Sequence, residues 1–449
     1  MQLNTSLWLN LLLVIIITIT NTSAYGYAKG DSVTAETLVR PAYKKPPPIS
    51  KYKELISIYE AKNIEFAFPS ERIRNAALNS GEYDPDNPLP IDVDVFYPGE
   101  GEEPKVFVTI PRFGSGVPYS LALLTDVQRP NGSEFQPYPD YSWHSTHGRD
   151  CDGLTSVYRI QIDQCGRMWI LDSGEIEFVQ HCAPQIVVID IRTETLIHRY
   201  RLPQKVYRTG VSRFVTPLVD ISDPPPFGTC SKAFVYMADA TGTSLIVYDM
   251  INNDSWRIEN KYTFPDPDYG THTVAGESFE LMDGVFSLSA TPRGLGLRRL
   301  LYFHALSNDV EVAVPLDVAN NSSNWRFGLG SSLDDFMVLG SRGIQCAASA
   351  MSANGFLLCG FLNPIAVVGW NIRTPYTARN RVILAENPNT LQFVSGLKVI
   401  RTPRGNEEVW MLSNRLQKTF SGTTNYEEIN YRIQKCGMDE LILGKQCRY

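Results

Sequence analysis

The sequence lacks the clustered features that several common function classes need. No run of Lys or Arg exceeds two residues, and 41 basic against 48 acidic residues give a net charge of −7. A nucleic-acid groove or an anionic-membrane surface is therefore not expected, because each needs concentrated positive charge. The eight cysteines include no Cys-x-x-Cys pair, which argues against a zinc knuckle and a thioredoxin-like site.

Nucleotide and hydrolase motifs are missing as well. No Gly-x-Ser-x-Gly or P-loop occurs, and Gly294-Leu-Gly296 lacks the third glycine of a dinucleotide fingerprint. His144-x-x-His147 has the spacing of metal ligands, but no clear third ligand accompanies it in its loop. We therefore expect neither a metal nor a cofactor.

Long apolar runs are confined to the amino terminus. The run from Leu7 to Ile19 is about 13 residues, too short to span a hydrocarbon core of about 30 Å. With Thr22-Ser23-Ala24 after it, the run is typical of a secretory signal peptide, although no Lys or Arg precedes it. A buried strand and a membrane anchor are the alternatives. We expect a signal peptide over 1–24, a lead segment over 25–60 and no membrane anchor.

Two further counts favour a secreted, extracellular protein. Glycosylation sequons stand in polar, turn-like surroundings at Asn131, Asn253, Asn320 and Asn321. The even number of cysteines predicts mostly disulfides, as in an oxidising compartment. The spacing alone does not tell which cysteine joins which.

The chain repeats one pattern six times. A strand and a short turn lead to a strongly apolar second strand, and the centres of these second strands lie 53 to 67 residues apart, at Phe107, Trp169, Val235, Tyr302, Leu357 and Trp410. Most units show a third strand and several a fourth, without amphipathic helices between them, which is typical of propeller blades. We predict an all-β, six-bladed β-propeller over 61–449. Two three-unit domains or a pair of β-sandwiches are the alternatives.

The sixth unit is one strand short. Ile64-Glu-Phe-Ala-Phe68, near the start, is an alternating strand that belongs to no unit. We expect this N-terminal strand to complete the last blade and close the ring, which would leave no sheet edge exposed.

Motifs along the chain resemble those of the yellow / major royal jelly protein family of insects. The match runs from about Ile64 to Cys447. Each motif is weak alone, but their order and spacing are specific. They are Val108-Thr-Ile-Pro-Arg112, Gly116-Val-Pro118, Gln136-Pro-Tyr-Pro139, Asp163-Gln-Cys-Gly-Arg-Met-Trp-Ile-Leu-Asp-Ser-Gly174, Leu245-Ile-Val-Tyr-Asp249, Ser255-Trp-Arg257, Leu301-Tyr-Phe-His304 and Val409-Trp-Met-Leu-Ser-Asn-Arg415.

The resemblance implies a secreted, often glycosylated six-bladed propeller. The chain departs from the family at Gly369-Trp370-Asn371, where members commonly carry a cysteine before the Trp-Asn pair. It has Cys346 and Cys359 instead, on strands that should be neighbours in the fifth unit. These two could form a cross-strand disulfide of their own.

Polar residues follow the second strands and should gather at one mouth of the ring, where propellers bind ligands. Asp172, Asp239 and Asn363 are candidates to bind an amine, a catechol or an indole, although turn chemistry also favours such residues at these places. In similar amine-binding salivary proteins, a Ser or Thr of the last inner strand and the Asn of a Ser-Asn motif hold the amine. The resemblance thus implies Ser395 and Asn414 as ligand-binding residues, with the backbone near Leu416 adjacent.

Other similar proteins convert dopachrome to dihydroxyindoles, a reaction that needs a base for a ring proton and a donor to the quinone oxygen. His304 is the candidate base, and Arg112 is the candidate partner of the substrate carboxylate; structural roles are the alternative for both. We therefore expect either a dopachrome isomerase or decarboxylating tautomerase of melanin and cuticle pigmentation or a binder of catecholamine precursors. A non-catalytic biogenic-amine carrier and a structural or nutritive secreted protein are the other hypotheses.

Overall fold

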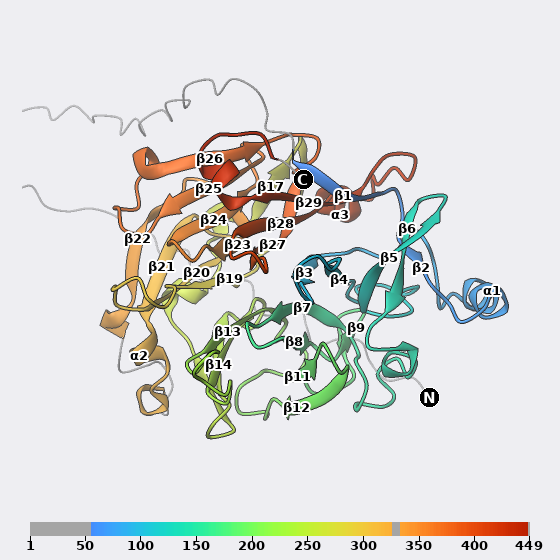
Figure 1. The fold of residues 1–449 in the computed structure, drawn as a ribbon, viewed down its shortest axis with the longest axis horizontal. Helices are drawn as coiled ribbons and strands as arrows, with labels where there is room; N and C mark the ends of the chain where they lie inside the picture. The colour runs from blue at the N-terminus through green and yellow to red at the C-terminus, as the bar shows by residue number, and fades with distance from the viewer. Residues whose placement is uncertain (1–54, 326–332, 448–449) are drawn as a thin grey trace, which may run out of the picture. The chain divides into compact units, whose positions relative to one another are not determined.

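Six antiparallel sheets, each of at least four strands, surround a common centre in the computed structural model, which describes residues 55–325 and 333–447 (Figure 1). The expected six-bladed propeller is confirmed. The signal peptide and nearly all of the lead segment expected over 1–60 lie outside the described residues. No helix of the described ranges is long and apolar enough to cross a membrane.

Within each blade the strands follow one another from the hub outward, so the first strand lines the centre. Blades 1 to 3 contain β3 (Asp92–Phe96), β4 (Lys105–Thr109), β5 (Leu121–Arg129) and β6 (Gly132–Pro137); β7 (Val157–Ile162), β8 (Arg167–Asp172), β11 (Gln185–Asp190) and β12 (Thr195–Arg201); and β13 (Phe214–Ile221), β14 (Ala233–Asp239), β15 (Ser244–Asp249) and β16 (Asp254–Ile258).

Blades 4 to 6 repeat the arrangement. They contain β19 (Val285–Ala290), β20 (Leu300–Ala305), β21 (Val310–Pro315) and β22 (Met337–Ser341); β23 (Cys346–Met351), β24 (Phe356–Phe361), β25 (Ala366–Asn371) and β26 (Arg381–Glu386); and β27 (Phe393–Arg401), β28 (Glu407–Asn414), β29 (Tyr431–Gly437) and β1 (Ile56–Ala61).

The apolar second strands form the core between blades. Phe107, Trp169, Val235 and Trp410, at the centres of four of them, are fully buried. Alternate side chains of a strand point to opposite faces, so a blade that packs on both faces needs apolar residues at successive positions. This is why the second strands are nearly continuous apolar runs.

An N-terminal strand closes the ring, but it is not the expected one. β1 pairs antiparallel with β29, with Ala61 opposite Tyr431, so the propeller begins before the expected boundary at residue 61. Within the segment 64–68, β2 (Glu65–Phe66) instead pairs parallel with β6 of the first blade. Phe66 is buried there in edge-on contact with the rings of Tyr119 and Tyr83, so the pairing with β6 takes its ring out of solvent.

Short helices, 3-10 turns and two small hairpins lie outside the blade strands. The helices are α1 (Glu71–Ser80), α2 (Leu316–Ala319), α3 (Leu416–Ser421) and α4 (Met438–Ile442); the 3-10 turns are Tyr141–Trp143, Lys261–Thr263, Pro267–Tyr269, Ser322–Asn324, Leu333–Asp335 and Ala378–Asn380. Two small hairpins are β9 (Glu175–Ile176) with β10 (Val179–Gln180) and β17 (Thr271–Val274) with β18 (Glu277–Glu280).

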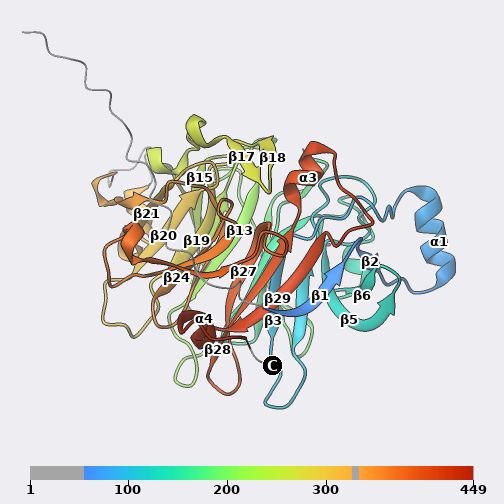
Figure 2. The same ribbon diagram turned by 90° about the horizontal axis from the view of Figure 1, so that it is seen from above.

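The two ends of the hub differ in their cover. The second strands finish at one end of the hub, which we call the α3 end. The first strands finish at the opposite end, which we call the cavity end. At the α3 end, the β17–β18 hairpin meets α3, and Figure 2 shows them together on the side opposite α4. Phe279 stacks on Phe420 with ring centroids 5.2 Å apart, and Lys418 Nζ lies 3.5 Å from Glu277 Oε1.

Four disulfides join the eight cysteines. Cys346–Cys359 links β23 to β24, so the cross-strand disulfide considered for these residues is present. The other three are Cys151–Cys182, Cys165–Cys230 and Cys436–Cys447.

Candidate functional site

The aspartates expected to face a ligand are buried loop anchors. Asp172 accepts hydrogen bonds from the backbone N–H groups of Thr155 (2.9 Å) and Ser156 (2.7 Å) and from Gln185 Nε2 (3.0 Å). Asp172 has no exposed surface. Its carboxylate therefore ties the loop before β7 to the end of β8.

Asp239 does the same one blade further on. Its carboxylate accepts from Ser212 Oγ (2.6 Å) and the Arg213 N–H (2.9 Å), and it pairs with Arg257 Nη1 at 3.0 Å. It is fully buried. The carboxylates at the ends of these second strands thus hold the adjoining loops. Their role as ligand contacts stays a prediction.

Arg112 is enclosed by backbone carbonyls. Its guanidinium donates to the carbonyl oxygens of Val117 (3.0 Å), Thr155 (2.6 Å), Pro118 (2.7 Å) and His144 (3.0 Å). Burial lowers the pKa of Arg112 to about 10. Four of its five N–H groups are used in this way, so the side chain pins the loop after β6 to the first blade.

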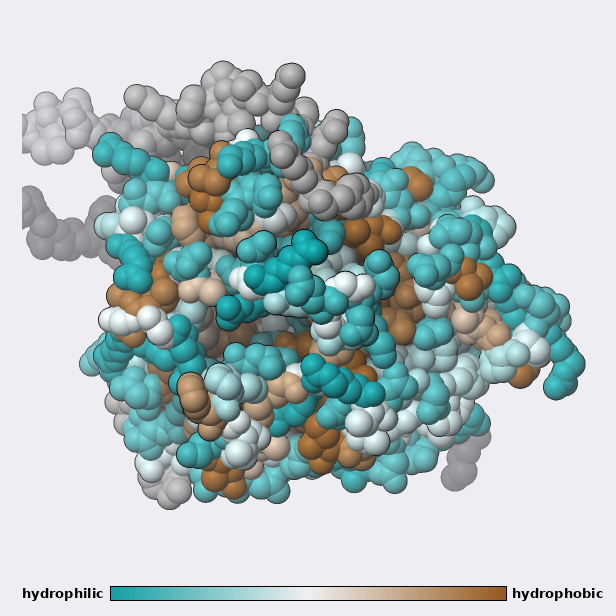
Figure 3. Space-filling model, viewed as in Figure 1, coloured by the Kyte–Doolittle hydropathy of each residue, from teal (hydrophilic) through white to brown (hydrophobic). Residues whose placement is uncertain are grey.

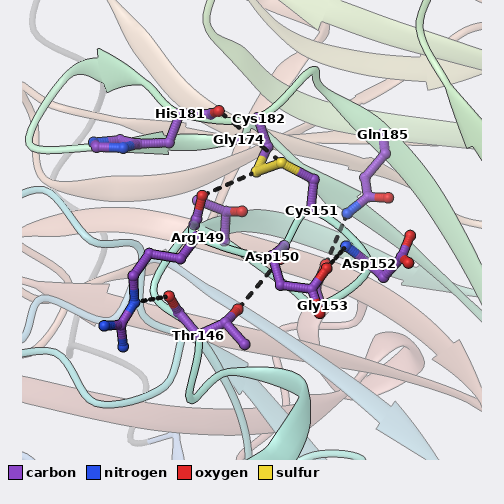
Figure 4. Close-up of a disulfide and its surroundings, with 12 residues drawn as sticks. Thr146, Arg149, Asp150, Cys151, Asp152, Gly153, Gly174, His181, Cys182 and Gln185 are labelled. Carbon is purple, nitrogen blue, oxygen red and sulfur yellow. Dashed lines mark hydrogen bonds between the residues drawn. A yellow bond between two sulfur atoms is a disulfide. The ribbon is translucent and has the colours of Figure 1, made fainter.

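A disulfide and a hydrogen bond also join the loop after β6 to blade 2, as Figure 4 shows. The Cys151–Cys182 disulfide fixes it, and Gln185 Nε2 donates to the Gly153 carbonyl at 2.9 Å. Of the two histidines with metal-ligand spacing, His144 lies 2.9 Å from the Tyr138 carbonyl and His147 lies 3.3 Å from Glu82. Each ring faces a different partner.

Asn414 and Ser395 lie close to the hub at the α3 end. Asn414 Nδ2 donates to the Pro90 carbonyl (2.9 Å), and its Oδ1 accepts from the Leu416 N–H (3.0 Å). Ser395 is buried on β27, and its backbone carbonyl accepts from Arg159. Asn363 is exposed in the turn between β24 and β25.

His304 is buried at the junction of blades 4 and 5. Its Nδ1 lies 3.0 Å from Glu311 Oε2, and that oxygen is 2.7 Å from Arg342 Nη1. Burial, followed by the charge of Arg342, lowers the pKa of His304, so the ring is neutral at physiological pH. The predicted role as a base stays untested by these contacts.

A cavity of about 510 Å³ opens instead at the cavity end of the hub. All six first strands line it. None of the seven residues predicted to bind or act on a ligand is among its lining residues. Figure 3 shows that hydrophilic residues predominate around the centre of the face in view. A volume of this size is ordinary for a small-molecule site.

Arg159 lines this cavity and contacts three other blades. From β7 its guanidinium donates to the carbonyl oxygens of Val215 on β13 (2.9 Å) and Ser395 on β27 (3.0 Å). It also lies over the ring of Phe286 on β19, 4.7 Å from the centroid. The side chain therefore joins the first strands of four blades at the hub.

Two aspartates of β3 stand in the cavity wall beside a lysine. Asp92 Oδ2 pairs with Lys398 Nζ at 3.1 Å, and Lys398 also donates to the Ile160 carbonyl at 2.8 Å. Asp94 accepts from the N–H groups of Val95 and Ile162, both at 2.8 Å. Burial raises the pKa of Asp94 to about 7, against the lowering effect of Lys398. Asp94 can therefore exchange a proton near neutral pH.

Hydroxyl groups and arginines complete the lining. Ser349 Oγ lies 2.7 Å from Ser287 Oγ and 3.2 Å from Ser289 Oγ on the neighbouring blade. At the mouth, Asp220 holds Arg293 at 2.7 Å and Arg299 at 2.6 Å. The site thus offers a buried proton acceptor, a cation and several hydrogen-bonding groups around one space.

Sequence reasoning missed this site, although one signal was present. The aspartates of Ile91-Asp-Val-Asp-Val95 alternate with apolar residues inside a first strand. Side chains two apart share a face, so both carboxylates had to lie on the same side of β3. On a first strand, one of the two faces points toward the hub.

Comparison with known proteins gives a consistent result. A family model described as Major royal jelly protein matches residues 155–447. The chain is 33% identical to Major royal jelly protein 9 of Apis mellifera, over 87% of this chain and 89% of that one. It is 31% identical to Dopaminechrome tautomerase of Drosophila melanogaster (88% and 84%) and 33% identical to Protein yellow of the same species (92% and 73%).

Proposed function

Because the chain belongs to the major royal jelly protein family, we propose that it is a secreted member that isomerises aminochromes, such as dopachrome or dopaminechrome, to dihydroxyindoles during pigmentation. The observation that carries the proposal is the juxtaposition of Asp94 and Lys398 in the wall of the hub cavity. A relative named for dopaminechrome tautomerisation supports the choice of reaction. The four disulfides support an extracellular location.

The proposed reaction is an isomerisation, so it consumes no oxidant and no cofactor. A base removes a proton from a ring carbon of the aminochrome, and the C–H electron pair moves into the ring. The quinone oxygens gain electron density and accept protons, which gives the dihydroxyindole. With dopachrome, loss of the carboxylate as carbon dioxide can supply the electron pair in place of the C–H bond.

Asp94 is the proposed base and Lys398 the proposed donor to the quinone oxygen. An ammonium carries three N–H groups, and Lys398 uses two of them on Asp92 and the Ile160 carbonyl. The third remains for a substrate oxygen. The hydroxyls of Ser287, Ser289 and Ser349 would hold the second oxygen of the ring.

The test is the loss of visible absorbance of dopachrome and dopaminechrome with purified protein. We expect acceleration over the blank, and a kcat/KM that rises with pH up to about 7, as Asp94 ionises. Asp94→Asn should lower kcat/KM by about 10²-fold or more. Asp126→Asn, the same change at an exposed position of β5, is the matched control. No acceleration over the blank with either substrate would refute the enzyme hypothesis.

Calorimetry with dopamine and serotonin tests the carrier hypothesis. A ligand in the hub cavity would bind more weakly to Asp94→Asn. A ligand held at the α3 end, as expected for Ser395 and Asn414, would bind more weakly to Asn414→Ala instead. Binding without turnover would assign the protein to the carriers, and absence of both would leave the structural or nutritive role.

A further inference from the structure

Asp220, near the cavity end of β13, holds two arginines of the loop between β19 and β20. Arg299 clamps it with both ends of its guanidinium, from Nη1 to Oδ2 at 2.6 Å and from Nη2 to Oδ1 at 2.9 Å. Arg293 Nη2 also donates to Oδ2, at 2.7 Å. No other carboxylate of the described ranges forms an ion pair with either arginine. One carboxylate thus faces two guanidinium groups, which leaves one positive charge uncompensated.

The two arginines differ in the N–H groups that they have left. Arg299 also donates from Nε to the Thr291 carbonyl at 3.0 Å, so three of its five N–H groups are used. Arg293 uses one N–H group, on Asp220, and 40% of its side chain is exposed. Both arginines line the hub cavity. Arg293 is therefore the cation that still offers a ligand two parallel N–H groups.

The arginines lie at about the same depth of the hub as Asp94. Asp94 on β3 accepts from the Ile162 N–H of β7 at 2.8 Å. Gln161, the residue before Ile162, accepts from the Val219 N–H at 2.7 Å and donates to the Val219 carbonyl at 3.4 Å. Asp220 follows Val219, and β7 lies between β3 and β13 around the hub (Figure 1). A ring beside Asp94 thus has the arginines at its own level of the cavity.

We propose that Arg293, positioned by Asp220, binds an acidic group on the ring ligand. The hub cavity then selects carboxylated aminochromes, such as dopachrome, over those that lack the carboxylate, such as dopaminechrome. The choice of ring rests on the proposed function. Arg112, which the sequence suggested for this role, does not line the cavity.

The chemistry of the trio favours a carboxylate as the bound group. A carboxylate is planar and presents two oxygens that match the paired N–H groups of a guanidinium. Asp220 holds Arg293 at the mouth without cancelling its charge, because Arg299 already balances Asp220 in a bidentate pair. Asp220 is therefore a positioning residue, and Arg293 is the residue that determines specificity.

The first measurement compares the kcat/KM of dopachrome with that of its methyl ester, which keeps the ring and removes the charge. We expect wild type to prefer dopachrome by about tenfold or more, as for a charge-assisted bidentate pair. Arg293→Gln should remove most of this preference, chiefly through a raised KM for dopachrome. Arg293→Lys keeps the charge but not the planar fork, so it should retain part of the preference.

Arg298→Gln is the matched control. It is the same change in the same loop, at an arginine that pairs with Asp317 at 3.0 Å and does not line the cavity. The preference for dopachrome over its ester should be that of wild type. An equal loss of preference in Arg298→Gln and Arg293→Gln would overturn the proposal, because the effect would then belong to the loop and not to the side chain.

Calorimetry with indoline-2-carboxylate and indoline separates this proposal from the proposed function, because neither compound can undergo the reaction. Tighter binding of the carboxylate by wild type, lost in Arg293→Gln, would support the arginine site even if no aminochrome is turned over. Turnover of dopachrome and its ester with equal kcat/KM would leave the enzyme in place and overturn the selectivity. No preference for the carboxylate in either measurement, or a preference that Arg293→Gln leaves intact, would also overturn the proposal.

Discussion

Ionisation of Asp94 should lower the free energy of unfolding near pH 7, the pH at which the proposed reaction needs Asp94 ionised. Its pKa is raised from the ordinary 3.8 to about 7 in the folded state, because the side chain is buried. The folded state therefore holds this proton more tightly than the unfolded one, and stability falls as pH rises from about 4 to about 7. The full effect of about 3 pKa units corresponds to about 4 kcal/mol.

Asp94→Asn removes this ionisation. In wild type, the two carboxylate oxygens of Asp94 accept from the N–H groups of Val95 and Ile162. Asn has only one oxygen, so the variant loses one of these hydrogen bonds, which lowers the free energy of unfolding by about 1–3 kcal/mol at any pH. The pH-dependent part is separate from that cost. Between about pH 5 and pH 8, the free energy of unfolding of the variant should gain about 3 kcal/mol relative to wild type.

The assay is guanidinium unfolding at both pH values, followed by tryptophan fluorescence with disulfides intact. Asp283, whose pKa burial raises to about 6, titrates in both proteins and cancels in the difference. Asp126→Asn should track wild type at both pH values. A difference between Asp94→Asn and wild type that does not change with pH would refute the buried, proton-holding role of Asp94.

Three further predictions concern stability and modification. Arg112→Met should lower the free energy of unfolding by at least about 3 kcal/mol, because four buried carbonyls lose their donor; a raised KM at unchanged stability would instead support its role with a substrate carboxylate. Loss of Cys165–Cys230, with a sequence separation of 65, should cost about 4 kcal/mol in denaturant unfolding, and loss of Cys436–Cys447, with a separation of 11, about 3 kcal/mol; the reverse order would contradict the chain-entropy argument. Mass spectrometry after deglycosylation should find the exposed Asn253 and Asn321 occupied more fully than Asn131, whose Nδ2 donates to Glu65 at 2.9 Å; dominant occupancy at Asn131 would contradict this.

Much of the fold could be predicted because each second strand is an uninterrupted apolar segment. All six predicted centres lie within the observed second strands, which are β4, β8, β14, β20, β24 and β28. Closure by an N-terminal strand was predicted, but the wrong segment was chosen, because local sequence does not tell which of two neighbouring strands pairs with β29. The sequence of β1, Ile56-Ser-Ile-Tyr-Glu-Ala61, alternates no more clearly than the segment chosen in its place.

The candidate site was harder to predict than the fold. Polar residues at the ends of β8 and β14 suggested a binding mouth, but backbone N–H groups of the adjoining loops use their carboxylates. Local sequence does not tell whether a carboxylate meets a loop or a ligand. Asp94, in contrast, lies within a strand. Its role depends on whether its face of the strand turns toward the hub, which the local sequence does not show.

The pairing of β1 with β29 also governs the order in which the chain can fold. Ala61 and its partner Tyr431 are 370 residues apart, an interval that takes roughly 20–70 s to synthesise at about 5–20 residues per second. During that time β29 has not been made, so β1 has no partner strand in its own chain. A newly made chain at high concentration therefore has the opportunity to donate β1 to the unfinished sixth blade of another copy, which would yield strand-exchanged dimers.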